Sequence, residues 1–130
     1  MEIFSVNWGM QFHDEFENEF ETFAEDVQDN LLAAAKAVQI AGPKAGRPHV
    51  DTLDGSKHAN MKELRFTAHG GREVWRAAFA FDPHRTAVVL VAADKQGKNQ
   101  KLFYKRLIKI ADRRFNVYLQ KVASGKTAKR

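Results

Sequence analysis

Apolar and polar positions alternate over the first residues of the chain. Farther along, the apolar positions recur every three or four residues. Residues 2–8 place apolar side chains on one face of an extended segment and polar side chains on the other, which predicts a strand. From residue 12 onward the apolar positions follow helical spacing and predict helical structure that ends by Gly42. This helical stripe consists of Phe12, Phe16, Phe20, Phe23, Val27, Leu31, Ala34 and Val38.

Thr22 and Glu25 have the spacing of a capping box, in which a hydroxyl side chain and a glutamate three residues later cap the first turn of a helix. We therefore predict two helices with a break near Thr22, although the stripe also allows one long helix. Residues 42–60 contain three glycines and two prolines and are predicted to form a loop with at most one short element.

Three strands and a long helix are predicted in the second half of the chain. Apolar and polar side chains alternate over residues 63–67 and 74–81, and residues 86–93 are almost continuously apolar, as in a central strand. Apolar residues at helical spacing then predict a helix from Asn99 to Gln120. The order β-α-α-β-β-β-α indicates an α+β domain, with the helices on one face of a mainly antiparallel sheet.

The length of 130 residues favours one domain, over residues 1–120, followed by a flexible basic tail over residues 121–130. Charge is distributed unevenly. Residues 1–35 contain nine acidic side chains and no lysine or arginine, so they carry −9, whereas residues 36–130 carry +14. A segment of this charge repels itself unless the acidic helices or a polyanion such as RNA lie against it.

The chain contains no cysteine, which excludes disulfides and thiolate metal sites. Its first residues lack the pattern of a secretion signal, and no apolar run approaches the ~18 residues of a membrane helix. We therefore expect a cytoplasmic protein without membrane segments. The five histidines have no zinc-binding spacing and a phosphate-binding P-loop is absent, so neither a metal nor another cofactor is expected.

Arg65 and Arg76 are the sharpest chemical signal. Each lies mid-strand, opposite large apolar side chains, so neighbouring strands would place both guanidinium groups on an uncovered face of the sheet. Ala78 and Ala80 would leave that face shallow enough for a ligand. A guanidinium binds phosphate through two hydrogen bonds and stays protonated. The alternative is an ordinary exposed arginine, or one paired with a strand glutamate such as Glu63.

A lysine-rich segment joins the last strand to the final helix. Lys95, Lys98 and Lys101 lie at this junction, where helix-start amides and ammonium groups can bind a phosphate. Lys101, Lys105 and Lys109 then recur every four residues, opposite the apolar face of the helix, and predict a row of charges directed at a polyanion. A solvated polar turn is the alternative interpretation.

Two aromatic residues, a histidine and an acid lie near these basic groups in the sequence. Phe103 is predicted to pack in the core and Tyr104 to lie near the rim, where a ring can stack on a base. His58, in the preceding loop, can reach the arginine face and act as an acid or base. Asp94 is expected to cap the turn or to pair locally with Lys98.

The segments MKELRF and VWRAAFAF and the lysine-rich stretch of residues 88–115 resemble the RelE/ParE toxin superfamily, in particular its HigB-like, phage-related branch. The resemblance covers residues 2–120. It implies a small, basic toxin of a type II toxin–antitoxin system, neutralised by a cognate antitoxin that we expect to be of the helix-turn-helix DNA-binding type. Many RelE- and HigB-like members cut mRNA in the ribosomal A site, whereas ParE-like members poison DNA gyrase.

Carried over to this sequence, the resemblance implies that Arg65 and Arg76 hold the scissile phosphate and that nearby lysines take part in proton transfer. The Tyr-His ending that some HigB-like enzymes use as acid and base is absent. The expected catalytic residues are Arg65, Arg76, Lys98, Lys101 and Tyr104, and the expected RNA-binding residues are Lys62, Lys95, Lys105, Arg106 and Lys109.

We therefore predict a metal-independent, ribosome-dependent mRNA endonuclease that inhibits translation, with mRNA, the ribosome and the antitoxin as partners. Two alternatives stay open at this point. One is a non-catalytic toxin of the same fold that inhibits gyrase, and the other is a plain RNA-binding module, whose affinity would fall with salt and whose expression would not be toxic.

Overall fold

The computed structural model describes residues 8–125 and builds them around a five-stranded sheet. The observed order agrees with the predicted α+β class, with one short strand added inside the predicted loop. In chain order the elements are β1 (Gly9–Phe12), α1 (Asp14–Phe20), α2 (Glu25–Ala41), the 3-10 turn η1 (Gly42–Lys44), β2 (Val50–Thr52), β3 (Met61–Ala68), β4 (Glu73–Phe81), β5 (Thr86–Asp94) and α3 (Gln100–Ala123).

The strands lie in the order β1-β5-β4-β3-β2. β1 runs parallel to β5, and the pairs β5–β4, β4–β3 and β3–β2 are antiparallel. The prediction of a mainly antiparallel sheet is therefore confirmed. The near-continuously apolar strand, β5, lies between β4 and β1, as its composition indicated.

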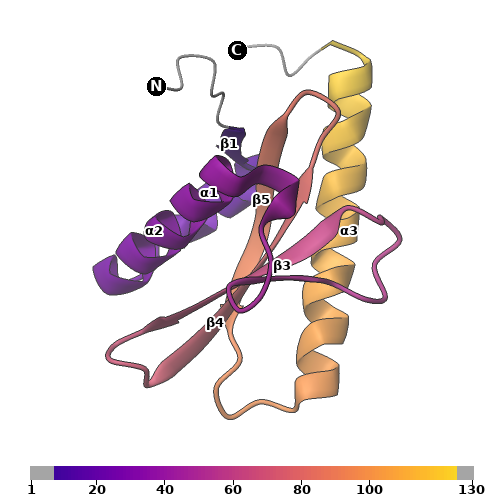
Figure 1. Ribbon diagram of the computed structural model, residues 1–130. Coiled ribbons are helices and arrows are strands. Elements are labelled where there is room, and N and C mark those ends of the chain that lie inside the picture. The colour runs from indigo at the N-terminus through magenta and orange to yellow at the C-terminus, as the bar shows by residue number, and fades with distance from the viewer. Residues whose placement is uncertain (1–7, 126–130) are drawn as a thin grey trace, which may run out of the picture.

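Helices cover both faces of this sheet (Figure 1). α1 and α2 pack on one face, in a core that includes Phe16 and Phe79, and α3 packs on the other, in a core that includes Leu90 and Leu107. The prediction that the helices share one face is therefore wrong. Each face of β4 and β5 carries apolar side chains, and both faces must be buried.

α3 lies over Ala78 and Ala80, which are fully buried. The prediction that these alanines leave an uncovered, shallow face is therefore wrong. Their small side chains instead allow a helix to approach the strand closely, while the large side chains on the other face of β4 pack against α1 and α2.

The N-terminal region contains two helices, as predicted, but the break is not a capping box. The Thr22 hydroxyl donates to the Glu19 carbonyl at 2.6 Å, and Ala24, which precedes α2, makes no side-chain cap. α1 is capped instead by His13, whose Nδ1 accepts a hydrogen bond from the backbone N–H of Glu15 at 3.1 Å.

The first described strand, β1, lies beyond the range predicted for the first strand. Residues 2–7 of the predicted strand lie outside the described residues, and β1 begins at Gly9. Phe12, which fits the helical stripe, is the last residue of β1, and its ring still contacts Phe16 and Phe20 of α1 at 5.0 and 4.9 Å between centroids. The stripe thus correctly predicted that Phe12, which is half-buried, packs with the helix, and it was wrong about the element at this position.

The final helix begins where predicted and ends slightly later. Asn99 caps α3 by accepting the N–H of Leu102 at 3.0 Å, and the helix continues to Ala123 rather than ending at Gln120. Residues 126–130 of the predicted tail lie outside the described residues. Within residues 8–125, no helix is long and apolar enough to cross a membrane.

Ion pairs join the acidic helix α1 to the C-terminal half of α3. Buried Arg114 donates to Glu19 at 2.9 Å and to the Leu90 carbonyl of β5 at 2.7 Å, and Lys121 lies 3.6 Å from Asp14. Part of the basic segment is therefore neutralised within the molecule. The N-terminal half of α3 keeps its lysines exposed.

Candidate active site between the sheet and the start of α3

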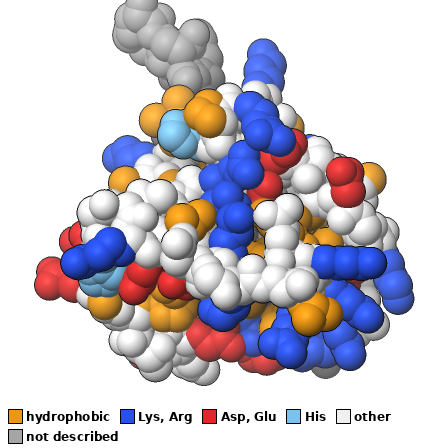
Figure 2. Space-filling model, turned by 90° about the horizontal axis from the view of Figure 1, so that it is seen from below, with side chains coloured by type: hydrophobic (Ala, Val, Ile, Leu, Met, Phe, Trp, Pro, Cys, Tyr) orange, Lys and Arg blue, Asp and Glu red, His pale blue; other side chains and the backbone are white. Residues whose placement is uncertain are grey.

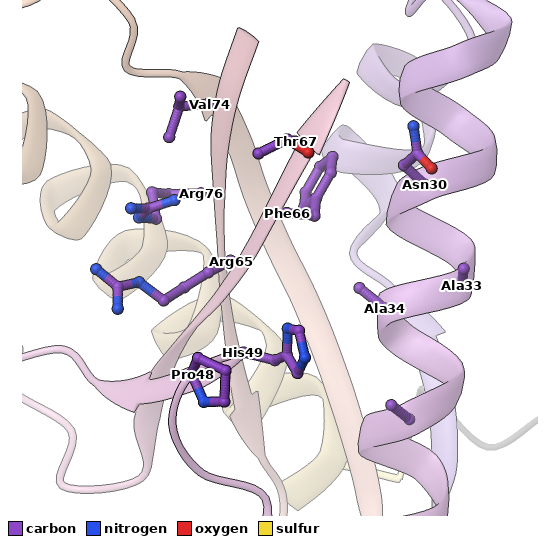
Figure 3. A pocket seen from close by; sticks show the side chains of 11 residues that line it. Asn30, Ala33, Ala34, Pro48, His49, Arg65, Phe66, Thr67, Val74 and Arg76 are labelled. Atoms are coloured by element: carbon purple, nitrogen blue, oxygen red, sulfur yellow. The ribbon is translucent and has the colours of Figure 1, made fainter. Parts of the chain in front are cut away.

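The two strand arginines lie side by side, as the alternation predicted. Arg65 on β3 and Arg76 on β4 are directly paired in the antiparallel register, so their side chains leave the sheet on the same face. Figure 3 shows the two guanidinium groups next to each other, while Phe66 points the opposite way, toward α2. The Arg65 side chain is 27% exposed, but the Arg76 side chain is only 9% exposed.

Arg76 is held by three groups. Its Nε donates to the Tyr104 hydroxyl at 3.1 Å and lies 3.6 Å from Glu63 Oε1, and its Nη1 donates to the Trp75 carbonyl at 3.0 Å. The expectation that both arginines lie on an uncovered face is therefore wrong for Arg76, because Tyr104 of α3 lies over it. Arg65 is partly exposed and lies beside Glu63, the pairing that the sequence offered as the alternative.

Glu63 joins the arginines to the tyrosine. It is 5% exposed, and its Oε1 accepts a hydrogen bond from the Tyr104 hydroxyl at 2.7 Å. Its Oε2 lies 3.5 Å from Nε of Arg65. The sequence-based interpretation treated Glu63 only as a salt-bridge partner, yet the signal was available, because a residue two positions before Arg65 lies on the same face of β3.

Tyr104 lies at the rim, as predicted, but its hydroxyl points to the arginines. Burial raises the pKa of this phenol, and the hydrogen bond to Glu63 raises it further, while Arg76 acts in the opposite direction. The hydroxyl therefore stays protonated at neutral pH and can donate a proton or a hydrogen bond. Phe103 is in the core, as predicted.

A cavity of about 710 Å³ runs from α2 across the edge of β3 to the two arginines. β2 pairs with β3 only as far as Leu64, so the edge of β3 beyond Arg65 is left beside this cavity. Figure 3 shows residues that line it from both sides of the strand. They are Asn30, Ala33, Ala34, Ala37, Pro48, His49, Arg65, Phe66, Thr67, Val74 and Arg76.

The predicted basic residues of α3 and of the turn before it divide between two flanks of the helix. Lys98 and Arg106 line a groove of about 430 Å³ beside β5, and Lys105 and Lys109 line a second groove of about 810 Å³ beside the loop before β3. Lys101 is exposed and, three residues before Tyr104, lies on the tyrosine side of the helix.

Figure 2 shows Lys and Arg side chains on the lower end of the molecule, in a file across its centre and in a group on the side of α3. The positive surface is therefore broader than the arginine pair.

Three predicted lysines are placed differently from the expectation. Lys62 lies on the opposite face of β3 from Arg65, by the alternation of the strand, and its Nζ donates to Thr52 at 3.0 Å. Lys98 binds the Asp94 carbonyl at 2.8 Å rather than the carboxylate. Lys95 is half-buried and continues the pairing of β5 with β4 through its backbone N–H.

Asp94 caps the turn, as one of its two predicted roles required. Its Oδ1 accepts the backbone N–H groups of Gln96 at 2.9 Å and Val74 at 3.1 Å. The junction that was predicted to bind phosphate is thus a turn whose backbone N–H groups are bound by Asp94.

His58 does not join the arginines. Its Nε2 lies 2.8 Å from Asn116 Oδ1, and its ring packs edge-on against Phe115. Asn116 lies twelve residues beyond Tyr104 on α3, a distance of about 18 Å along a helix. The proposed acid or base role of His58 at this site is therefore wrong. Within the described part of the chain, no cluster of three potential metal ligands occurs.

Comparison with known proteins assigns this chain to a protein family. The family model described as phage derived protein Gp49-like matches residues 18–116. The chain belongs to the Gp49-like family. This membership and the relatives below confirm the predicted resemblance to the HigB-like branch of the RelE/ParE superfamily.

Two Mycobacterium tuberculosis proteins named as toxins are similar to this Gp49-like chain. One, HigB2, is 42% identical over 105 residues, which are 81% of this chain and 51% of HigB2. The other, HigB3, is 39% identical over 100 residues, which are 77% of this chain and 83% of HigB3. The chain thus spans about half the length of HigB2 and most of HigB3.

A mutant of the Escherichia coli toxin RelE, solved in the free state, has a similar structure, with a TM-score of 0.57 over 80% of this chain and 97% of that chain. At 11% identity, this likeness concerns the fold alone. It confirms the predicted RelE-like fold.

Proposed function

We propose that this Gp49-like chain is the toxin of a type II toxin–antitoxin system and inhibits translation by cutting mRNA on the ribosome. The observation that carries the proposal is the pairing of Arg65 with Arg76 beside Tyr104, at a cavity, in a chain whose relatives bear toxin names. Guanidinium groups suit the negative charge that develops on a phosphate during strand cleavage.

The chemistry requires two proton transfers besides charge stabilisation. The 2′-oxygen of the RNA attacks the phosphorus after losing its proton, the bond from phosphorus to the 5′-oxygen breaks, and the 5′-oxygen takes up a proton. In our proposal Arg65 contacts the phosphate, and Tyr104, which is protonated at neutral pH, turns its hydroxyl from Glu63 to the leaving oxygen and donates its proton there. Lys101, on the same side of α3, is the candidate that removes the proton of the 2′-hydroxyl group, a step that requires its neutral amine form.

The partners in this proposal are mRNA, the ribosome and a cognate antitoxin of the helix-turn-helix type. The exposed Lys101, Lys105 and Lys109 row, on one flank of α3, and the broad positive end in Figure 2 suit an RNA backbone. A site that is only partly tuned for proton transfer gains from a ribosome that positions its substrate.

The test is expression of the wild-type chain and of Arg65→Ala, each with and without the neighbouring gene. Wild type should arrest growth and produce discrete cuts within codons, mapped by primer extension. Arg65→Ala should lower cleavage by about 10²-fold, the usual effect of removing a transition-state donor.

Arg72→Ala is the matched control, because Arg72 is an exposed arginine on the β3–β4 hairpin whose Nε donates to the His69 carbonyl of the adjacent turn at 3.1 Å. It should retain wild-type toxicity. Arg76→Ala is a poorer test, because removal of this buried cation leaves Glu63 without one of its partners. Growth arrest with an SOS response and intact mRNA would contradict the proposal and indicate gyrase as the target.

A further inference from the structure

Arg65 and Arg76 present a physical problem that the arginine pair alone does not solve. They are direct cross-strand partners, and like charges placed opposite each other on two strands repel. Without a neutralising group between them, two long cationic side chains would separate and turn toward solvent. An arrangement that keeps the two guanidinium groups side by side therefore needs a third group to hold them together.

Glu63 has the geometry of that group. One carboxylate oxygen serves each arginine: Oε2 lies 3.5 Å from Nε of Arg65, and Oε1 lies 3.6 Å from Nε of Arg76. The same Oε1 accepts the Tyr104 hydroxyl at 2.7 Å. One buried carboxylate thus contacts β3, β4 and α3 side chains at once.

Glu63 contacts Arg65 away from the two terminal nitrogens that would bind a phosphate. Glu63 lies 3.5 Å from Nε of this guanidinium, an ion-pair contact, because the buried Nε makes no hydrogen bond among the described residues. Within residues 8–125 the two terminal nitrogens of Arg65 make no hydrogen bond to protein, and the residue lines the cavity. A phosphate binds a guanidinium through two such nitrogens. The carboxylate therefore orients the arginine without occupying its binding edge.

We propose that Glu63 is the positioning residue of this site: it holds Arg65, Arg76 and Tyr104 in one arrangement and does not itself touch the RNA. The inference rests on the proposed function, because it assigns a role within that reaction. It also predicts that Glu63 holds Tyr104 in the free protein, and this contact can be tested without RNA.

The activity experiment compares Glu63→Gln with wild type. Glutamine keeps the size of the side chain and can still accept a hydrogen bond, but it cannot neutralise two guanidinium groups. We expect mRNA cleavage to fall about 10- to 100-fold, as misplacement of reacting groups does. Arg65→Ala should reduce cleavage less in the Glu63→Gln background than in wild type, because the two residues act together.

Glu73→Gln is the matched control. Glu73 is a half-buried strand acid on β4 whose Oε1 accepts the Trp75 indole N–H at 2.9 Å, on the face that packs against α2. It should cut mRNA at the wild-type rate. Urea unfolding of both variants separates a loss of positioning from a loss of folded protein.

The second measurement is the ultraviolet titration of tyrosine in the purified protein. The chain has only two tyrosines, and Tyr118 is buried with its hydroxyl on Asp82. Since the negative charge of Glu63 contributes to the raised pKa of Tyr104, Glu63→Gln should make this phenol ionise at lower pH. Tyr104→Phe identifies which transition belongs to this residue, and circular dichroism on the same samples follows the fold.

An unchanged tyrosine titration, or cleavage by Glu63→Gln at the wild-type rate, overturns the inference. Complete loss of cleavage at every pH with an unchanged titration also overturns it, because that result assigns Glu63 direct chemistry. If wild type neither arrests growth nor cuts mRNA, the proposed function is refuted, while the titration still decides whether Glu63 holds Tyr104.

Discussion

Replacement of Arg114 by alanine should destabilise the protein far more than the same change at the adjacent Arg113. The Arg114 side chain is 6% exposed and joins α1, β5 and α3, whereas the Arg113 side chain is 58% exposed. Among residues 8–125, the ion pair of Arg113 is a 3.5 Å contact with the exposed Glu15. The pair is therefore a matched test of a buried and a surface ion pair on one helix.

The magnitude follows from the contacts of Arg114. Loss of two buried methylenes removes roughly 1.6 kcal/mol. The Leu90 carbonyl, on the part of β5 beyond its pairing with β1, loses a charged donor, which costs about 1–3 kcal/mol. Glu19 is 43% exposed and can be rehydrated, so its lost pair adds less than about 1 kcal/mol.

Relief of the buried guanidinium offsets part of this loss, because desolvation of a charge is costly and Arg114 Nε has no hydrogen-bond partner among the described residues. We therefore expect a net loss of about 2–3 kcal/mol for Arg114→Ala. Arg113→Ala should lose less than about 0.5 kcal/mol, as exposed ion pairs do.

The assay is urea unfolding followed by circular dichroism, together with thermal unfolding, where Arg114→Ala should lower Tm by roughly 10 °C. Arg114→Met retains the aliphatic stem and isolates the polar contribution, which should be about 1–2 kcal/mol. Equal midpoint shifts for Arg113→Ala and Arg114→Ala, or an Arg114→Met variant as stable as wild type, would refute the reasoning.

Three further predictions concern single side chains. Tyr104→Phe should reduce mRNA cleavage by at least about 10²-fold if the hydroxyl transfers a proton, measured by primer extension, and a wild-type rate would exclude that role. Burial lowers the pKa of His13, so the neutral ring is favoured in the folded state, and the free energy of unfolding should fall as pH drops from about 7 to 5. His13→Ser keeps a side chain that can cap α1 but does not titrate, so urea unfolding of this variant at each pH should show a weaker pH dependence. Gly42→Ala should destabilise the protein by more than about 1 kcal/mol in thermal unfolding, because φ is +62° and the added Cβ would lie 2.5 Å from the Trp8 indole, whereas Gly70→Ala meets no atom within 4 Å and should lose less.

Local sequence patterns predicted most elements of this fold. The helical stripe indicated α1 and α2, and Asn99 was placed at the start of the last helix, where its side chain caps α3. Strand alternation placed Arg65 and Arg76 on the same face, and the register of β3 with β4 makes them direct partners. These features depend on residues only a few positions apart, so a single sequence contains the required information.

Only the tertiary structure decided what surrounds the arginines. Alternation allowed either an open face or a covered one over Ala78, and α3 covers it because both faces of β4 are apolar. That packing brings Tyr104 over Arg76 and joins both to Glu63, and it directs Lys98 and Lys105 to different flanks of one helix. Such contacts depend on how distant segments bury each other's surfaces, and no short-range period in the sequence encodes that.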